Sequence, residues 1–292
     1  MPTPESRAAV RVETAEAPGR QYERFKRLNR ILHVIMIVSF MSLALTGMTL
    51  KFSYTGWAVF LSHLFGGFES AGYIHRVAAV SMIGIFIAHL LDVVKMKRES
   101  YKTWRAFLFS PDSMMFNKKD LLDFVGNIKW FLGRGPRPAY GRWTYWEKFD
   151  YLAVFWGIAV IGSTGLMLWF PEFFTHFVPG WFINVATIIH SDEALLAVGF
   201  IFTVHFFNTH LRPEKFPMDI VIFTGRMTLE ELEQDKPAEY KALKEAGKLD
   251  EHLVEPYPTI LVRGVRVFGW LALATGFGIV VWIIYAMLFA YR

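Results

Sequence analysis

Residues 187–210, TIIHSDEALLAVGFIFTVHFFNTH, decide the fold that the sequence predicts. The stretch is predominantly apolar and long enough to cross the hydrocarbon core of a membrane, which takes about 20 helical residues. It nevertheless holds His190, His205 and His210, although polar side chains in hydrocarbon are costly unless they have a function. We therefore expect a membrane-spanning helix whose histidines carry out chemistry.

Four further apolar stretches have the same character, and the charged residues gather between them. These candidate spans are 31–50, 74–94, 149–170 and 263–290. The sequence therefore predicts an all-α integral membrane protein with a four-helix bundle and a fifth C-terminal span. Its expected parts are a tail (1–30), a four-helix domain (31–212) with an internal loop (95–148), a polar loop (213–262) and the fifth span (263–290).

The composition excludes several classes of protein. The chain has no cysteine, which excludes disulfides, iron–sulfur clusters and covalently attached c-type haem, so histidine is the obvious ligand for any redox centre. The net charge of +5 does not indicate a nucleic-acid partner, because the basic residues adjoin the spans and form no separate basic domain.

The distribution of Lys and Arg predicts the orientation in the membrane. Segments 1–30 and 95–148 contain seven and twelve Lys or Arg residues, whereas 51–73 contains only Lys51 and 171–186 contains none. Cytoplasmic loops are enriched in these residues. We therefore expect a multi-pass protein of the bacterial inner membrane with a cytoplasmic N-terminus.

Both long polar loops are expected to form short helices. The 95–148 loop combines Pro, Gly and Trp, which indicates interfacial helices that could dock a partner subunit. Residues 228–249 predict one or two solvated helices with an N-cap at Thr228.

The first four spans resemble a doubled helical hairpin. In each half, a Thr-Gly dipeptide in one span is followed by two histidines in the next. The matched features are Thr46-Gly47 with Thr164-Gly165, His75 with His190, and His89 with His205; the offsets of the glycines and of the two histidine pairs are 118, 115 and 116 residues. Such regular offsets favour two related hairpins.

Helical geometry places the histidines at two depths. His75 and His89 are 14 residues apart, which is about 21 Å along a helix and roughly 40° off one face. His190 and His205 are 15 residues apart, which is about 22 Å and roughly 60°. Since these two spans run in the same direction, His75 faces His190 at the outer level and His89 faces His205 at the inner level. Each pair could hold a six-coordinate haem iron, which predicts two haem b groups.

The inner level has more histidines than one haem needs. His33 lies at the same depth as His89 and His205, so His33 and His89 compete for the inner iron, and His210 allows a third haem. The repeat favours His89 with His205, which leaves His33 for another role such as a quinone hydrogen bond. Arg76 adjoins His75 and is the best candidate partner for haem propionates.

These motifs resemble one known family. From residue 24 to 220 the chain resembles the di-haem membrane cytochromes b that include the formate dehydrogenase gamma subunit and the cytochrome b of Ni-Fe hydrogenases. The carriers of the resemblance are Arg30-x-x-His33, Thr46-Gly47, His75, Thr164-Gly165 and the His190/His205 pair.

The resemblance implies specific ligands. It assigns the outer haem to His75 and His190, the inner haem to His33 and His205, and a quinone site close to the inner haem. His89 departs from that pattern and resembles the paired-histidine helices of bc-type cytochrome b, which leaves the inner ligand pair open.

The resulting hypothesis is a membrane cytochrome b subunit of a respiratory oxidoreductase complex. It would transfer electrons between a partner, either an iron–sulfur subunit or a multihaem cytochrome c, and menaquinone or ubiquinone. The chain has no catalytic residue that we can assign and would not act as an enzyme alone. The alternative is a transporter that relays protons through its intramembrane histidines, although a relay needs graded rather than matched depths.

Overall fold

The predicted all-α membrane fold is confirmed. A computed structural model describes residues 19–290, and within that range five helices are long and apolar enough to span a membrane. The spans are Arg27–Lys51, Phe68–Ser100, Tyr145–Trp169, Trp181–Leu211 and Thr259–Ala290.

The first two spans, α2 (Arg27–Lys51) and α4 (Phe68–Ser100), form one hairpin. The third span is composite: α7 (Tyr145–Gly157) continues through a π-helical segment (Ile158–Gly162) into α8 (Ser163–Trp169). Helix α4 begins well before residue 74, so the predicted start of this span is wrong and His75 lies inside the helix. The helix continues into the polar boundary because its backbone hydrogen bonds do not depend on the surrounding hydrocarbon.

The last two spans also contain π-helical turns. The fourth span starts with α10 (Trp181–Phe200) and then winds through two π-helical segments, Ile201–His205 and Phe207–Leu211. His190 therefore lies in the middle of α10 and does not open it. Helix α14 (Thr259–Tyr285) ends in a further π-helical segment, Ala286–Ala290. Such turns frequently occur at functional sites because they redirect backbone carbonyl groups and side chains.

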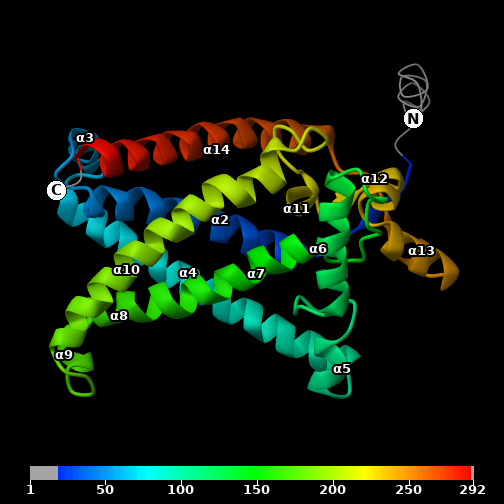
Figure 1. Cartoon of the computed structure of the whole chain (residues 1–292), viewed down its shortest axis with the longest axis horizontal. Coiled ribbons are helices and arrows are strands. Elements are labelled where there is room, and N and C mark those ends of the chain that lie inside the picture. The colour runs from blue at the N-terminus through cyan, green and yellow to red at the C-terminus, as the bar shows by residue number, and fades with distance from the viewer. Residues whose placement is uncertain (1–18, 291–292) are drawn as a thin grey trace.

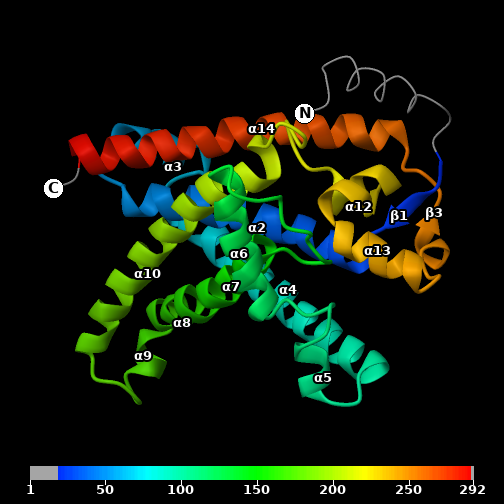
Figure 2. The same cartoon turned by 45° about the vertical axis from the view of Figure 1, so that its right-hand side comes forward.

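The spans lie along the long axis of the molecule (Figure 1). Helices α2 and α4 pack side by side, and α10 packs on both α8 and α2. Helix α14 runs along the other side of α2, as a turned view also shows (Figure 2). At one end of the spans lie α3 (Gly56–Leu64) and α9 (Pro171–Phe174). We call this the opposite end, because the other end of the spans carries most of the polar elements.

The other end, which we call the polar end, carries a small sheet and several short helices. Strand β1 (Gln21–Glu23) lies between β2 and β3 in antiparallel pairing. The remaining elements here are α5 (Trp104–Leu108), α6 (Lys118–Phe131), α11 (Val221–Thr224), β2 (Arg226–Met227), α12 (Leu229–Asp235), α13 (Pro237–Glu245), a 3₁₀ turn (Asp250–His252) and β3 (Leu253–Val254). These strands are too short to show an alternation of apolar and polar residues, so the sequence does not predict the sheet.

The predicted helices of the polar loops are confirmed. Thr228 caps α12 by accepting a hydrogen bond from the backbone N–H of Glu231, and the Glu231 side chain accepts one from the Thr228 N–H. Helices α5 and α6 occupy the 95–148 loop, and α6 begins with a capping box between Asn117 and Asp120.

A buried ion-pair cluster joins the polar end to the spans. Arg24 lies 3.4 Å from Glu147 and 3.3 Å from Glu239, Lys236 lies 2.5 Å from Glu147, and Arg142 lies 2.9 Å from Glu239. Burial lowers the pKa of Lys236, while the nearby Glu147 carboxylate opposes that shift. The cluster connects the segment before α2, the first turn of α7 and helix α13.

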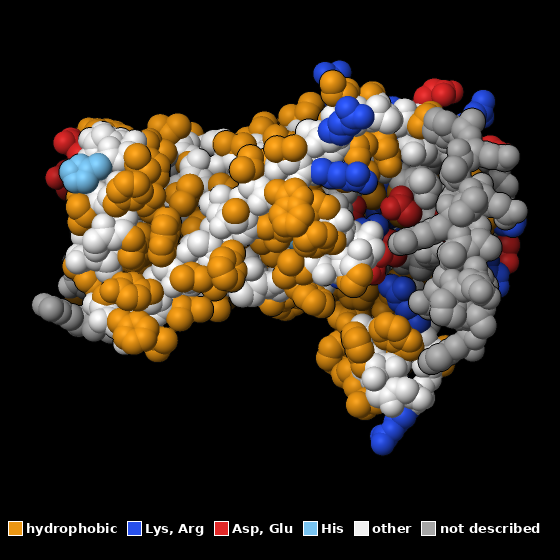
Figure 3. Space-filling model, turned by 90° about the horizontal axis from the view of Figure 1, so that it is seen from above, with side chains coloured by type: hydrophobic (Ala, Val, Ile, Leu, Met, Phe, Trp, Pro, Cys, Tyr) orange, Lys and Arg blue, Asp and Glu red, His pale blue; other side chains and the backbone are white. Residues whose placement is uncertain are grey.

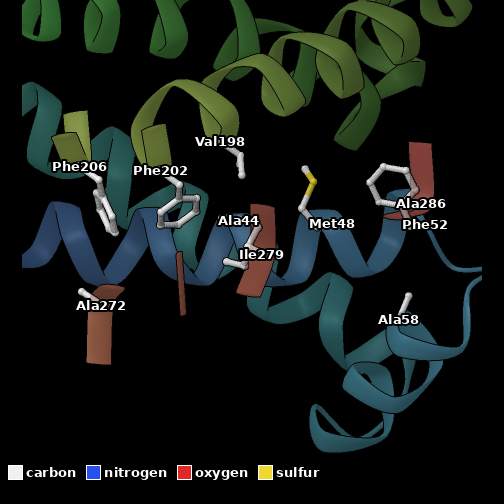
Figure 4. Packing of buried hydrophobic residues seen from close by; sticks show 10 residues of the cluster. All are labelled: Ala44, Met48, Phe52, Ala58, Val198, Phe202, Phe206, Ala272, Ile279 and Ala286. Carbon is white, nitrogen blue, oxygen red and sulfur yellow. The ribbon is translucent and has the colours of Figure 1, made fainter. Parts of the chain in front are cut away.

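The apolar core lies where α2, α10 and α14 meet. Ala272 and Ile279 of α14 pack against α2, and Phe202 and Phe206 lie close to them (Figure 4). A Cβ at Gly276 would come within 2.5 Å of the Phe202 ring, so glycine is required for this approach. The fifth helix is therefore packed firmly on the four-helix bundle.

Candidate functional site

A large cavity runs through the four-helix bundle. Its volume is about 2340 Å³, and it extends from Lys51 near the opposite end to Arg24 and Lys236 at the polar end. Ligand pockets usually measure about 300–1,000 Å³, so this cavity has room for more than one large ligand. All five histidines that we predicted as ligands line it: His33, His75, His89, His190 and His205.

His75 and His190 face one another across the cavity. Their ring centroids are 6.2 Å apart, and the rings are inclined by 74°. Helical geometry predicts that His75 and His190 lie at the same depth, and the two side chains do lie together near the opposite end. The two residues come from α4 and α10, the second helix of each predicted hairpin.

Both imidazoles of this pair are held through Nδ1. The Thr46 hydroxyl donates to the Ser42 carbonyl at 2.6 Å, so it accepts from His75 Nδ1–H at 3.0 Å. His190 Nδ1–H donates to the Ile161 carbonyl at 3.0 Å. With Nδ1 as the donor, the lone pair of each Nε2 is available to a metal ion.

The Thr-Gly dipeptides explain how the histidines come so close to the preceding span. A Cβ at Gly47 would lie 3.2 Å from His75 Cε1, and a Cβ at Gly165 would lie 2.9 Å from His190 Cε1. In contrast, a Cβ at Gly84 would have no neighbour within 4 Å. The two hairpins therefore share one contact, a Thr-Gly dipeptide that receives a histidine of the next span.

The second level of histidines is built differently. His205 Nδ1–H donates to the Asp150 carboxylate at 3.0 Å. His89 is bonded through Nε2 to the Tyr151 hydroxyl at 2.9 Å. Consecutive residues of a helix point about 100° apart, so Asp150 and Tyr151 hold these two histidines on different sides of α7. The structure does not bring His89 and His205 into a facing pair.

The two other histidines of this level have separate environments. His33 lies edge-on to Phe223 of α11, with ring centroids 6.3 Å apart. His210 is buried and donates from Nδ1 to the Pro217 carbonyl at 2.9 Å. Across residues 19–290 we find no hydrogen bond from the His33 imidazole.

Arg76 lines the cavity beside the His75–His190 pair. Its guanidinium lies over the rings of Tyr73 and Trp169, at 5.9 and 5.7 Å from their centroids. The described part of the chain offers it no carboxylate within ion-pair distance, whereas nearby Lys51 is paired with Asp192 at 2.9 Å. Arg76 is therefore free to bind an anionic group.

The sequence pattern did not predict a role for Asp150, Tyr151 or the carbonyl group of Ile161. Asp150 carried a usable signal, because an acidic residue inside a predicted span is rare and usually functional. One of its carboxylate oxygens, Oδ1, is buried and has no hydrogen-bond partner among the described residues. The Ile161 carbonyl had no such signal, since it reaches His190 from a π-helical segment that the sequence did not predict.

The fold and the site define a multi-pass, all-α membrane protein with paired histidines in an internal cavity. No protein-family model matches the chain. The chain is similar to the F420 non-reducing hydrogenase II cytochrome subunit of Methanosarcina mazei, with 25% identity over 251 residues, which cover 80% of this chain and 86% of the relative. This similarity supports the class of a cytochrome subunit of an oxidoreductase complex, on the hydrogenase side of the resemblance drawn above.

Proposed function

We propose that the chain is a membrane cytochrome b subunit that transfers electrons between a partner redox subunit and the quinone pool through two haem b groups. The observation that carries the proposal is the facing pair of His75 and His190. Metal–imidazole nitrogen bonds of about 2 Å place the centroids of two rings about 6 Å apart. The observed 6.2 Å suits one iron ion between the two imidazoles.

Three further features of this level support a haem. The cavity has the volume for a porphyrin, the hydrogen bonds on Nδ1 orient both imidazoles, and Arg76 is available for an anionic propionate. Metal-binding histidines usually donate their second N–H to a carbonyl or carboxylate, which fixes the ring and raises its basicity.

We assign the second haem to His205 and His33. His205 donates from Nδ1 to Asp150, the arrangement expected of a metal-binding histidine. His33 lines the same cavity as His205, and the family resemblance implies the same pair. His89 is a weaker candidate, because its Nε2 is already bonded to Tyr151.

When bound, the haem supplies one-electron redox chemistry, and the chain supplies orientation and a low-dielectric surrounding. Thr46 and the Ile161 carbonyl hold one pair of imidazoles, and Asp150 holds His205. Two centres at different depths would carry electrons across the apolar layer without a mobile carrier. The His89–Tyr151 pair lies in the same cavity as His205 and offers hydrogen bonds to a quinone near the second haem.

The Lys and Arg distribution supports a cytoplasmic location for the polar end and the N-terminus. By analogy with the family that the chain resembles, we place the partner subunit at the opposite end, beside the His75–His190 pair. The relative is named as a cytochrome subunit of a hydrogenase, which supports a redox subunit as the partner, either an iron–sulfur subunit or a multihaem cytochrome c. The inner membrane remains the proposed location.

The test is a reduced-minus-oxidised optical spectrum of the purified chain with haem quantified as the pyridine haemochrome. We expect a b-type spectrum and about two haems per chain. The control is His176→Ala, because His176 is exposed outside the predicted pairs and should leave the spectrum unchanged. Protein without haem, made with ample haem supply, would overturn the proposal and favour the proton-relay transporter.

A further inference from the structure

Helix α6 has its polar side toward the protein and its apolar side outward. Asp120 pairs with Lys148 at 2.8 Å in a buried site, and Asn127 donates to the Tyr145 hydroxyl at 2.9 Å. The outward side chains are all large, apolar and exposed: Leu121, Leu122, Phe124, Val125, Ile128 and Phe131. A helix that faces water has the opposite arrangement, so this face needs an apolar neighbour.

The position of α6 indicates what that neighbour is. Tyr145 and Lys148 belong to the first turn of the third span, so their bonds to α6 hold it where that span begins. Helix α6 runs across the direction of the spans (Figure 1). It stands out from the bundle near the polar end, and hydrophobic side chains cover the side of this protrusion that faces along the spans (Figure 3). That side points toward the hydrocarbon layer in which the spans lie.

The charges around this face are basic. Lys118, Lys129 and Arg134 lie at the two ends of α6, and none of them has a carboxylate within ion-pair distance in the described part of the chain. The acidic residues of the helix are neutralised by lysines, Asp120 by Lys148 and Asp123 by Lys119. Basic residues beside an apolar helix face attract anionic lipid headgroups.

We infer that α6 lies in the membrane interface and binds anionic phospholipid. Acyl chains would cover the apolar face, while Lys118, Lys129 and Arg134 would bind the headgroup phosphates. A protein partner is disfavoured, since the face points along the spans into the bilayer. This anchor would fix the start of the third span, whose residues Trp146 and Glu147 line the cavity. The inference does not depend on haem.

The absence of cysteine from the chain makes the test direct, because each introduced cysteine carries the only spin label. In nanodiscs holding the full chain, a label at Leu122→Cys should collide severalfold more often with dissolved oxygen than with a water-soluble nickel chelate. A label at Val77→Cys, which is exposed on α4, serves as the lipid reference, and one at Lys241→Cys on α13 serves as the water reference.

A Leu122 label that behaves like the one at Lys241 would overturn the inference, because α6 would then face water. Protection from both reagents would also overturn it, in favour of a protein that covers the face. Since Leu122 is 70% exposed, its replacement should not disturb folding.

The headgroup contact needs a second measurement. Lys118→Gln, Lys129→Gln and Arg134→Gln together should lower the amount of anionic phospholipid that copurifies with the chain severalfold, with neutral lipid unchanged. The matched control replaces Lys241, Lys244 and Lys248 by Gln, which removes the same charge at α13 and beyond. Equal lipid retention in the two triple variants would overturn the assignment of the headgroup site.

Discussion

The two levels of histidines have almost the same spacing in the sequence but different surroundings in the structure. Near the opposite end, His75 and His190 face one another, and each is held through Nδ1 by the span before it. Nearer the polar end, His205 is held through Nδ1 by Asp150, whereas His89 is bonded through Nε2 to Tyr151. A repeat in the sequence therefore predicts depth along a helix but not which nitrogen is available to a metal.

The largest expected effect is at the His75–His190 level, where the two hairpins hold their histidines in the same way. His190→Ala would remove one of the two proposed ligands of the outer haem, and we expect haem content to fall from about two to about one per chain. Pyridine haemochrome quantification measures the change. His63→Ala, on α3 and outside the cavity lining, is the control that should retain both haems.

The second prediction concerns the other level and tests whether His33 or His89 binds the second haem together with His205. His33→Ala should lose the second haem, while His89→Ala should keep both, because the Nε2 atom of His89 is bonded to Tyr151. The same haem quantification applies, with a redox titration to identify which haem remains. The reverse result would assign the second haem to His89 and His205, as the repeat alone predicts.

A third, smaller effect tests the close contact between glycine and histidine. Gly165→Ala places a Cβ 2.9 Å from His190 Cε1, and we expect the overpacking to destabilise the site by about 1–3 kcal/mol. Haem retention during thermal denaturation measures it. Gly47→Ala should have a weaker effect, since its Cβ would lie at 3.2 Å, and Gly84→Ala should have none. Equal losses in all three variants would contradict a role for this contact.

The smallest expected effect concerns the group that holds His205. Asp150→Asn removes the negative charge from the hydrogen bond to Nδ1, so the imidazole becomes less basic and the potential of the second haem should rise. We also expect about 10–100-fold weaker binding of that haem. Potentiometric titration reports each haem separately, and Thr46→Val should shift only the other one. A shift of both haems in Asp150→Asn would indicate a general disturbance of the bundle.

The apolar runs of the sequence predict all five spans, but some of the predicted ends are wrong. Helix α4 includes Phe68–Tyr73 before the predicted start and reaches Ser100 beyond the predicted end. Hydropathy marks where hydrocarbon begins, whereas a helix ends where its backbone hydrogen bonds end, and these points differ at a polar boundary. The sequence does not predict the strands β1, β2 and β3, because they have only two or three residues each.

The depths of the histidines were set by the sequence alone. In hydrocarbon the backbone must satisfy its own hydrogen bonds, so each apolar run has to be helical. The fixed rise per residue then places His75 level with His190 once the spans are known. The pairing of these two side chains follows from that geometry and from the two Thr-Gly dipeptides.

Only the tertiary structure decided what each imidazole bonds to. The partners of His89 and His205 are neighbours in α7, far away in the sequence, and their directions depend on how that helix is rotated in the bundle. The Ile161 carbonyl is free to accept from His190 in a π-helical segment, which arises from local winding. Helix rotation and winding result from packing between distant segments, so the pattern of residues along one span does not contain them.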